Sequence, residues 1–404
     1  MDGRLALGAQ VLGAAGRILA DRIDEARGIA LPRTPEQLAR PEALDALLRE
    51  GAPEGAPALP RVRTAFLPGV DFESSNCRNF LVRVAFENAE RADAALPNTL
   101  YAKLPCAGLP TRAFAHVTGF WRAEVAFCRR VAARAPIRVP RVFAAVERGA
   151  RFALLLENVR ELPGATLFVN RDMEAGTTVE RARRCVETFG ALHAGFAGLS
   201  PAERDALLPM RLHPYLSPEG RERNRALNAA SIGPAHRAAP EILTKRHVAL
   251  CRMAIEKWDA LLEAWYAEPL TLIHGDSHLA NCFEYDGPEG RRTGMLDFQG
   301  VQWCRGIRDV QYHLIDSFAP GLLAECEDEL LRHYVDALAK AGVPLTADDA
   351  RAQYRALSFQ TLLVAVVSLG LGSLTEREAL VRTLLARSVA ALDRLEFGDW
   401  LAGL

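Results

Sequence analysis

The sequence predicts an α+β protein with two lobes: a small lobe built on an antiparallel sheet and a larger, mostly helical lobe. Three observations lead to this prediction. The 404 residues are too many for one small domain. Short alternating apolar segments dominate residues 61–156, whereas apolar residues recur at helical spacing over most of residues 179–395. Between these regions a polar connector, residues 157–159, forms a natural hinge.

The small lobe is expected to occupy residues 56–158, after an N-terminal helical extension over residues 1–55 that is interrupted by prolines. Alternating apolar residues indicate five strands in this lobe, with one helix between the third and the fourth. The strands are expected over residues 61–67, 79–86, 99–104, 142–147 and 151–156, and the helix over residues 114–133.

The helical lobe is expected to occupy residues 159–404. A short buried strand over residues 270–273 leads into a polar loop, and two strands over residues 282–285 and 294–296 pair as a hairpin. Residues 200–240 are rich in Arg, Pro and His and have no clear period, so we expect loops and short helices that are candidates for a substrate lid. Helices are expected over residues 179–196, 244–267, 310–317, 322–341, 347–371 and 376–395.

The composition is ordinary for a globular protein: half hydrophobic, a quarter charged, with a net charge of −1. Such a balance offers no basic surface for nucleic acid or an anionic membrane. The longest apolar run, residues 362–374, is shorter than the roughly 20 residues of a spanning helix, and the first residues do not resemble a secretory signal. The eight cysteines are scattered singly, without metal-ligand spacing. We therefore expect a cytoplasmic monomer or homodimer that binds a small molecule, and neither nucleic acid nor a membrane.

The most informative segment combines three polar residues at suggestive spacing. It reads His274-Gly275-Asp276-Ser277-His278-Leu279-Ala280-Asn281 and continues, after a short hairpin, with Asp297-Phe298-Gln299. Phosphoryl transfer needs a group that orients the attacking hydroxyl and oxygen ligands that hold Mg²⁺. Asp276 is the candidate for the first role, and Asn281 and Asp297 are the candidates for the second. The alternative is a loop in which Asp276 and Asn281 only form Asx-type hydrogen bonds.

Two histidines accompany these residues. His274 is predicted to be structural, with its ring fixing the backbone of the loop. His278 is expected either to line the substrate side or to pack. The hairpin after Asn281 is expected to fold the chain back, so that Asn281 and Asp297 meet at one site.

Lys103 is one of only four lysines, and all other basic residues are arginine. It lies in an alternating, strand-like segment, where a compact ammonium suits the α- and β-phosphates of ATP better than a planar guanidinium. A solvated lysine on a strand is the alternative. Glu124 is the only acid on the following predicted helix and is the candidate that orients Lys103.

The phosphate loop is the least regular part of the predicted nucleotide site. No G-x-G-x-x-G lies between the first two strands, and the candidate phosphate contacts are Ser74, Ser75 and Asn76. Backbone amides and small hydroxyls in such a turn are able to cradle phosphate. The alternative is a plain hairpin loop.

Together these residues resemble the aminoglycoside phosphotransferase and choline kinase superfamily, and the H-G-D-x-H-x-x-N and D-F-Q forms are most similar to its ecdysteroid-kinase-like branch. The resemblance covers roughly residues 60–400. It implies a protein-kinase-like bilobal fold with ATP between the lobes. In this arrangement Lys103 contacts the phosphates, Glu124 lies behind it, and the adenine lies against the backbone from Glu157 to Val159.

The resemblance also implies Asp276 as catalytic base, Asn281 and Asp297 as magnesium ligands, and Asp309 as a structural residue. Two departures distinguish the chain from a protein kinase. Gln299 replaces the glycine of D-F-G, and no A-P-E segment follows. Without an activation loop, the expected substrate is a small molecule with a hydroxyl group.

Two other functions fit parts of the sequence. A nucleotide-binding pseudokinase or regulatory module would keep the fold without needing Asp276 as a base. A metal-dependent phosphoesterase would use Asp276, Ser277 and His278 as ligands, but it needs a second ligand loop with an Asn-His pair, which the chain lacks. For the acceptor, Trp258, Trp265 and Trp303 in the helical lobe favour a lipophilic alcohol or a steroid-like compound.

Overall fold

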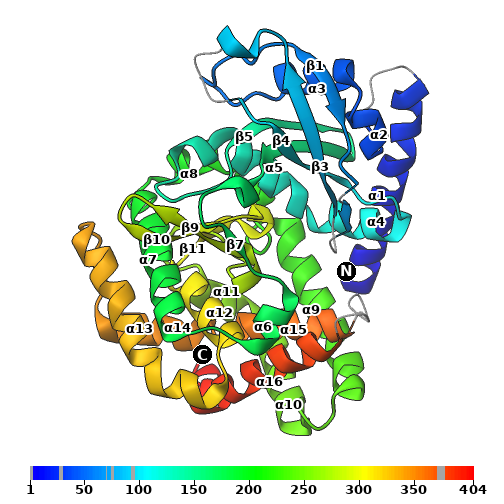
Figure 1. Ribbon diagram of the computed structural model, residues 1–404. Helices are drawn as coiled ribbons and strands as arrows, with labels where there is room; N and C mark the ends of the chain where they lie inside the picture. The colour runs from blue at the N-terminus through cyan, green and yellow to red at the C-terminus, as the bar shows by residue number, and fades with distance from the viewer. Residues whose placement is uncertain (1–2, 27–30, 70, 74–76, 92–95, 371–377) are drawn as a thin grey trace. The chain divides into compact units, whose positions relative to one another are not determined.

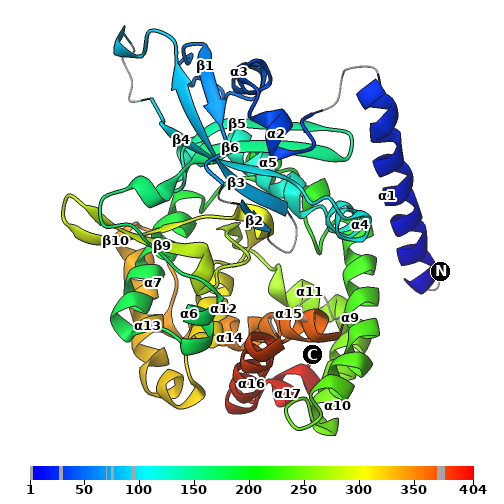
Figure 2. The same ribbon diagram turned by 45° about the vertical axis from the view of Figure 1, so that its right-hand side comes forward.

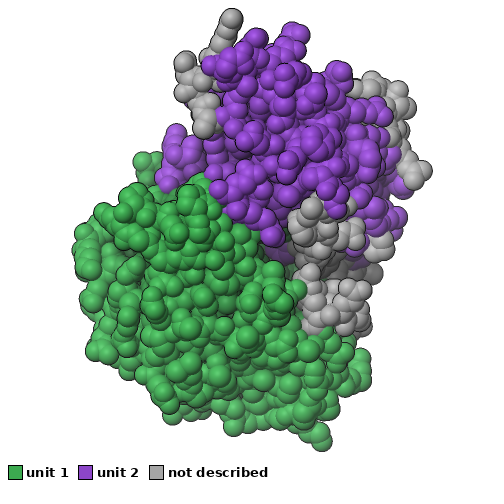
Figure 3. All heavy atoms as spheres, viewed as in Figure 1, with its two compact units in different colours: residues 1–4, 136–138, 162–404 green, residues 5–135, 139–161 purple. Residues whose placement is uncertain are grey.

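The computed structural model of the protein (Figure 1) describes residues 3–26, 31–69, 71–73, 77–91, 96–370 and 378–404. The chain divides into two compact units (Figure 3). One contains residues 5–135 and 139–161, and is called the sheet unit below. The other contains residues 1–4, 136–138 and 162–404, and is called the helical unit.

The sheet unit contains a mixed set of helices and strands. Its strands are β1 (Val62–Phe66), β2 (Asp71–Glu73), β3 (Cys77–Phe86), β4 (Thr99–Pro105), β5 (Val142–Arg148) and β6 (Arg151–Glu157). Its α-helices are α1 (Gly3–Ala26, from Leu5 on), α2 (Pro35–Leu38), α3 (Pro41–Glu50), α4 (Leu109–Thr118) and α5 (Phe120–Arg130). Three short 3₁₀ helices complete it, η1 (Ala89–Arg91), η2 (Ala132–Arg134) and η3 (Val159–Glu161).

The six strands form one antiparallel sheet. The strand order is β1-β3-β4-β6-β5, and β2 pairs with β3. Five strands are expected from the sequence, and β2 is the additional one, because three residues of the connection between β1 and β3 pair back onto β3. Apolar residues are buried along β3, β4 and β6, as expected for strands with neighbours on both sides.

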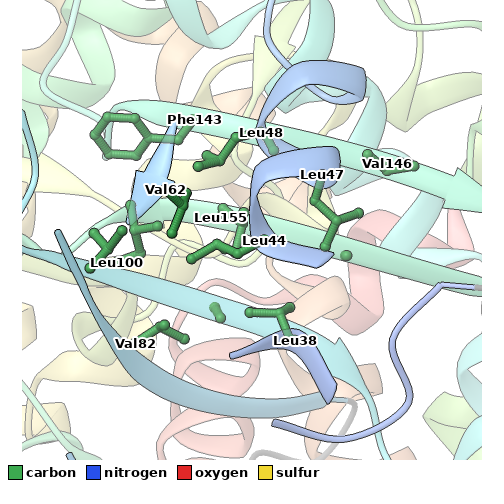
Figure 4. Close-up of a cluster of buried hydrophobic side chains, with 14 of the residues drawn as sticks. Leu38, Leu44, Leu47, Leu48, Val62, Val82, Leu100, Phe143, Val146 and Leu155 are labelled. Carbon is green, nitrogen blue, oxygen red and sulfur yellow. The ribbon is translucent and has the colours of Figure 1, made fainter. Parts of the chain in front are cut away.

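The core of the sheet unit includes helices from the N-terminal region. Leu44, Leu47 and Leu48 of α3 recur at helical spacing and are buried against the sheet together with Leu38 of α2 (Figure 4). Pro41 at the first position of α3 suits a helix start, where a missing N–H costs nothing. Burying one such leucine contributes about 1.5–3 kcal/mol. Residues 35–50 therefore share the hydrophobic core of the sheet.

The helix expected over residues 114–133 is interrupted. Gly119 has φ 73° and separates α4 from α5. A glycine takes this left-handed conformation without steric cost, and it ends α4 through a hydrogen bond from its N–H to the Ala115 carbonyl. The expected single helix is thus wrong, because the prediction overlooked the stop signal at Gly119.

The helical unit is dominated by α-helices (Figure 1 and Figure 2). They are α6 (Asn170–Ala175), α7 (Val179–Gly195), α8 (Pro201–Leu207), α9 (Pro218–Ala238), α10 (Lys245–Glu256), α11 (Trp258–Trp265), α12 (Ile307–Ser317), α13 (Pro320–Lys340), α14 (Ala347–Leu357), α15 (Phe359–Gly370), α16 (Glu378–Arg394) and α17 (Phe397–Ala402). The 3₁₀ helices are η4 (Met210–Leu212), η5 (Leu279–Asn281) and η6 (Phe298–Gly300). None of the described helices is long and apolar enough to cross a membrane.

Two small sheets accompany these helices. One has the order β10-β9-β7, from β7 (Thr166–Leu167), β9 (Cys282–Gly287) and β10 (Gly290–Met295). The other pairs β8 (Thr271–Ile273) with β11 (Gln302–Cys304). The predicted hairpin over residues 282–296 is confirmed, since β9 and β10 pair in antiparallel register from Cys282–Met295 to Gly287–Gly290.

Residues 200–240 are more regular than expected. They contain the 21-residue helix α9, which packs beside α15 (Figure 1 and Figure 2). The side chain of Ser217 accepts a hydrogen bond from the Gly220 N–H and caps the helix. The buried side of α9 includes Asn228 and Ser231 as well as Ile232, so an apolar period is absent from the sequence although the helix is packed.

His213 supports strand β11, and its burial leads us to expect that the free energy of unfolding depends on pH. Its Nε2 atom donates to the Trp303 carbonyl (2.9 Å), and its Nδ1 atom accepts from the N–H groups of Tyr215 and Leu216. Burial lowers the pKa of His213 to about 4, from an ordinary value near 6.5. At pH values between about 4 and about 6.5, His213 therefore binds a proton in the unfolded chain but not in the folded chain.

This difference means that stability falls as the pH drops from about 6.5 towards about 4, by up to about 3 kcal/mol. Urea unfolding at pH 7.5 and pH 5 measures it. We expect His213→Asn to lower the stability at pH 7.5 but to reduce the loss on acidification, whereas the partly exposed His333→Asn keeps the wild-type loss. An identical pH dependence in His213→Asn would contradict this assignment.

Candidate active site

The polar loop over residues 274–281, called the motif loop below, joins β8 to β9. β8 is buried at all three positions, and the loop ends in η5, whose last residue is Asn281. Gly275 has φ 79°, and a Cβ atom at this position would overlap the carbonyl group of Gly300. The glycine is therefore required by both its backbone conformation and the close approach of η6.

Asp309 at the start of α12 fixes the backbone of the motif loop. Its Oδ2 atom accepts from the His274 N–H (2.6 Å), and its Oδ1 atom accepts from the Gly275 N–H (2.8 Å). His193 Nε2 donates to Oδ2 (3.2 Å), and the Ser277 hydroxyl donates to the Asp309 carbonyl (2.8 Å). Burial opposes the charged form, but the hydrogen bond and charge of His193 outweigh it, so the pKa of Asp309 is lowered. These contacts are those of a structural residue.

His274 has both ring nitrogens engaged by the backbone. Its Nε2 atom donates to the Leu296 carbonyl (2.9 Å), and its Nδ1 atom accepts from the Asp276 N–H (3.2 Å). The ring also lies 4.6 Å from the Phe298 ring, centroid to centroid. This pattern defines a neutral tautomer that connects the motif loop to the hairpin.

Asp276 carries a partly exposed carboxylate, with 41 % of its side-chain surface accessible. The Tyr312 hydroxyl donates to its Oδ1 atom (3.2 Å), and Asn281 Nδ2 donates to its Oδ2 atom (3.2 Å) and its carbonyl (2.8 Å). His278 Nε2 lies 3.5 Å from Oδ2. Burial disfavours the charge, but the charge and hydrogen bond of His278, with Arg308, outweigh it and lower the pKa of Asp276. The carboxylate is thus ionised at neutral pH.

One face of α12 supplies three polar side chains to this region. Arg308, Tyr312 and Asp316 are spaced four residues apart and so lie on the same side of the helix. The Arg308 guanidinium stacks over the Tyr312 ring, 4.5 Å from its centroid. Burial, opposed by His278 and reinforced by the charge of Asp276, raises the pKa of Asp316 to about 7. These three residues were not predicted from the sequence, although their spacing of four residues around and after Asp309 is visible there.

The β9–β10 hairpin brings the two candidate magnesium ligands, Asn281 and Asp297, to the same end of the hairpin. Met295 pairs with Cys282, and the Leu296 N–H donates to the Asn281 carbonyl (3.0 Å), one residue before Asp297. Asp297 has φ 64° and ψ 65°, a left-handed conformation that non-glycine residues adopt mainly at turns and functional sites.

The donor atoms here are suited to a hard cation. Every hydrogen bond found for the Asn281 side chain uses Nδ2, so Oδ1 is the atom left to face a cation among the described residues. Asp297 adds a half-buried carboxylate. An amide oxygen and a carboxylate are the ligand types that Mg²⁺ prefers, and the residues therefore fit this ion.

In the sheet unit, Lys103 and Glu124 form a buried ion pair. Lys103 lies on β4 between Asn79 of β3 and Leu154 of β6, and its Nζ atom is 2.6 Å from Glu124 Oε1 of α5. The exposed fractions of the two residues are 3 % and 2 %. The predicted pairing of this lysine with this acid is present, and the solvated-lysine alternative is wrong.

The other nucleotide candidates lie at the end of the sheet or outside the described residues. Glu157 ends β6, and its carboxylate accepts from the Arg141 N–H (2.9 Å). Val159 begins η3 and is buried. Ser74, Ser75 and Asn76 lie outside the described residues.

A sequence model of the Ecdysteroid kinase-like family matches residues 135–343. This match spans more than half of the chain and includes the motif loop, the hairpin and α12. The chain belongs to the Ecdysteroid kinase-like family. Membership in this family indicates a small-molecule kinase-like phosphotransferase. The resemblance predicted from the H-G-D-x-H-x-x-N and D-F-Q residues is thus confirmed. Lys103 and Glu124 lie outside the matched residues.

Small-molecule kinases are among the solved structures to which this chain is similar. An ethanolamine kinase from Plasmodium vivax is 12 % identical, with 82 % of this chain and 83 % of that chain covered and a TM-score of 0.47. A choline kinase from Streptococcus pneumoniae is 10 % identical, with 80 % and 93 % covered and a TM-score of 0.41. A GDP complex of an aminoglycoside 2'-phosphotransferase is 12 % identical, with 90 % and 100 % covered and a TM-score of 0.48. No curated protein sequence matches this kinase-like chain.

The tryptophans proposed to favour a lipophilic acceptor are core residues in this family member. Trp258, Trp265 and Trp303 each have an exposed fraction of 1 % or less. The indole N–H of Trp265 donates to the Ala356 carbonyl, and that of Trp303 donates to the Leu208 carbonyl. They pack within the helical unit and do not present an apolar surface to a ligand, so this argument for a lipophilic substrate is wrong.

Gly275 offers a direct test of the shape of the motif loop in this kinase-like chain. We expect Gly275→Ala to lower the free energy of unfolding by roughly 2 kcal/mol more than Gly342→Ala. Gly342 has nearly the same φ, 78°, but open space around its Cβ position. The matched pair therefore separates steric overlap with Gly300 from backbone strain. Equal losses in urea unfolding would show that the close approach of Gly300 is unimportant.

Proposed function

We propose that the protein transfers the γ-phosphate of ATP to a hydroxyl group of a small molecule, with Asp276 as the base. The observation that carries the proposal is the state of Asp276 in a member of a kinase-like family. Its carboxylate is partly accessible and is oriented by Tyr312 and Asn281. The backbone beneath it is fixed by Asp309.

Asp276 would accept a hydrogen bond from the acceptor hydroxyl and receive its proton as the phosphate is transferred. Orientation is the main requirement of such a reaction, because the barrier depends on alignment of the oxygen with the phosphorus atom. Tyr312 occupies Oδ1, and Asn281 lies at Oδ2. These two donors limit the rotation of the carboxylate. A fixed carboxylate loses little entropy when the acceptor binds.

Asn281 and Asp297 would hold Mg²⁺ through their side-chain oxygens. When bound, this ion compensates negative charge on the phosphate oxygens. Asn281 Nδ2 is already committed to Asp276, which orients Oδ1. The left-handed backbone at Asp297 directs the chain out of the hairpin and into η6 at this point.

Lys103 would contact the nucleotide phosphates, with Glu124 holding its ammonium group. A strand lysine in a 2.6 Å ion pair has a defined position, which a flexible surface lysine lacks. The backbone from Glu157 to Val159 would meet the adenine. Phosphate contacts by Ser74, Ser75 and Asn76 remain a prediction from the sequence.

Only one feature of the acceptor, its reacting hydroxyl group, is part of the proposal. Because the tryptophans are buried, they do not support a preference for a lipophilic alcohol or steroid-like compound. The charges that act on Asp276 include those of His278 and Arg308, and Asp316 also interacts with Asp276. An acceptor that carries polar groups beside its hydroxyl suits these neighbours better than a purely apolar one.

A metal-dependent phosphoesterase is disfavoured by the same geometry. The Ser277 hydroxyl donates to the Asp309 carbonyl and is fully buried, so it does not face a metal. Among the described residues, the group of three His, Cys, Asp or Glu donors close enough to hold an ion includes neither Asp276 nor His278.

Calorimetric titration with Mg²⁺ and ATP, followed by an acceptor screen, tests the proposal. We expect saturable binding of the nucleotide, and a phosphomonoester product from at least one compound in a broad library of small alcohols. Nucleotide binding without any product would favour the pseudokinase or regulatory module. Absence of nucleotide binding would contradict the proposal altogether.

A further inference from the structure

Three potential metal ligands converge next to the motif loop from three separate elements. Cys185 lies on α7, Cys282 is the first residue of β9, and His313 lies on α12. Their ligand atoms all lie within 4.8 Å of one another. The three residues are far apart along the chain, so no sequence motif indicates the group.

The cluster is shielded from water. Cys185, Cys282 and His313 each have an exposed fraction of 0 %. A thiolate is the form of cysteine that binds metal ions. Two sulfur atoms and one imidazole nitrogen in a dry site are the donors that thiophilic ions prefer.

His313 is oriented as a metal ligand would be. Its Nδ1 atom lies 3.0 Å from the Ser277 carbonyl and must donate to it. The Nε2 atom is buried and makes no hydrogen bond to a nitrogen or oxygen atom of the described residues, and the ring interacts with the Cys185 thiol. Metal-bound histidines commonly donate their second ring N–H to a carbonyl, which fixes the tautomer in this way.

We propose that Cys185, Cys282 and His313 bind one thiophilic d¹⁰ metal ion, either Zn²⁺ or Cu⁺. Metal–sulfur bonds of about 2.3 Å and metal–nitrogen bonds of about 2.0 Å place the ligand atoms of such a site about 3.5–4 Å apart. Small side-chain rotations therefore complete it. Two metal–sulfur bonds and one metal–nitrogen bond form, the thiol protons leave to solvent, and no oxidation state changes.

The bound ion would stabilise the motif loop from its buried side. His313 already contacts the Ser277 carbonyl, and Cys282 Sγ lies 3.8 Å from the His278 carbonyl. An ion at this position would link α7, β9 and α12, in addition to the ion pair between Arg184 of α7 and Glu284 of β9. The alternative is that the two cysteines act as small buried hydrophobes, as most buried cysteines do.

Metal titration of the full chain, purified with a thiol-free reductant, tests the proposal. Co²⁺ replaces Zn²⁺ as a spectroscopic probe, and Cu⁺ is titrated anaerobically against a competing chelator. We expect one ion per chain, a sulfur-to-cobalt charge-transfer band, and an X-ray absorption spectrum with two sulfur ligands and one nitrogen ligand. The two titrations distinguish zinc from copper. Wild-type protein that binds neither ion stoichiometrically would overturn the proposal.

Substitutions identify the ligands. We expect Cys185→Ser and His313→Gln each to weaken binding of the preferred ion by more than about 10-fold, since even a lost neighbour of a ligand costs about 10–100-fold. Cys251→Ser is the matched control, because Cys251 is also buried and free but lies on α10. Equal affinity in all three variants would overturn the assignment. The wild-type spectra keep the test decisive if a variant fails to fold.

Discussion

Replacing Asp276 with asparagine is expected to lower kcat for phosphate transfer by about 10²–10⁴-fold, the usual contribution of a positioned acid or base. Asparagine keeps the size of the side chain and is able to keep a hydrogen bond from Tyr312, but it cannot accept the proton of the hydroxyl. The KM for ATP is expected to change little, because the residues proposed to contact the nucleotide are unaltered. Steady-state kinetics with an acceptor from the alcohol screen measure both constants.

Asp348→Asn provides the control for this prediction. Its side chain is 97 % exposed at the start of α14, so the same chemical change there is expected to leave kcat unaltered. If Asp276→Asn retained wild-type kcat, Asp276 would not be the base. A loss of kcat together with a large loss of stability would point instead to a structural role, so urea unfolding accompanies the kinetics.

Replacing Lys103 with methionine is expected to have two separable effects. The change removes the lysine from a buried ion pair, and the loss of one partner from such a pair costs about 3–5 kcal/mol of stability. It also removes the ammonium group proposed to bind the nucleotide phosphates. We therefore expect a lower free energy of unfolding and a loss of ATP affinity, measured by urea unfolding and calorimetry.

The double variant Lys103→Met with Glu124→Leu distinguishes these effects. Apolar side chains of similar size in place of a buried ion pair are often neutral for stability, so we expect most of the stability to return. Nucleotide affinity should stay low. Lys340→Met, at an exposed position on α13, serves as the control for removing a lysine. Recovery of ATP affinity in the double variant would exclude Lys103 as a phosphate contact.

Local patterns were sufficient to predict the longer strands and the motif loop, but not the short strands β2, β7 and β11. Alternating apolar residues in β3 and β4 and the continuous apolar run of β6 identified the central strands, because side chains point to the same face of a sheet at every second position and β6 is buried on both faces. The hairpin was predictable because its two strands are adjacent in the chain. That closeness brings Asn281 beside Leu296. The ion pair of Lys103 was predicted from the rarity of lysine and the single acid on the next helix.

Long-range packing explains what the sequence did not predict. Helix α9 buries Asn228 and Ser231 against neighbouring elements, so no apolar stripe distinguishes it from a loop. The tryptophans Trp258, Trp265 and Trp303 are large and apolar, which suits a ligand site and a core equally well before burial is known. Cys185, Cys282 and His313 meet only because α7, β9 and α12 are packed together.

Phosphorus NMR of wild-type protein and Asp276→Asn, mixed with Mg²⁺, ATP and the alcohol library, tests the central claim most directly. We predict that a phosphomonoester signal grows in step with ADP for the wild-type protein and is nearly absent for Asp276→Asn. The account would be contradicted if the wild-type protein released only inorganic phosphate from ATP, or if the two proteins formed the phosphomonoester at the same rate.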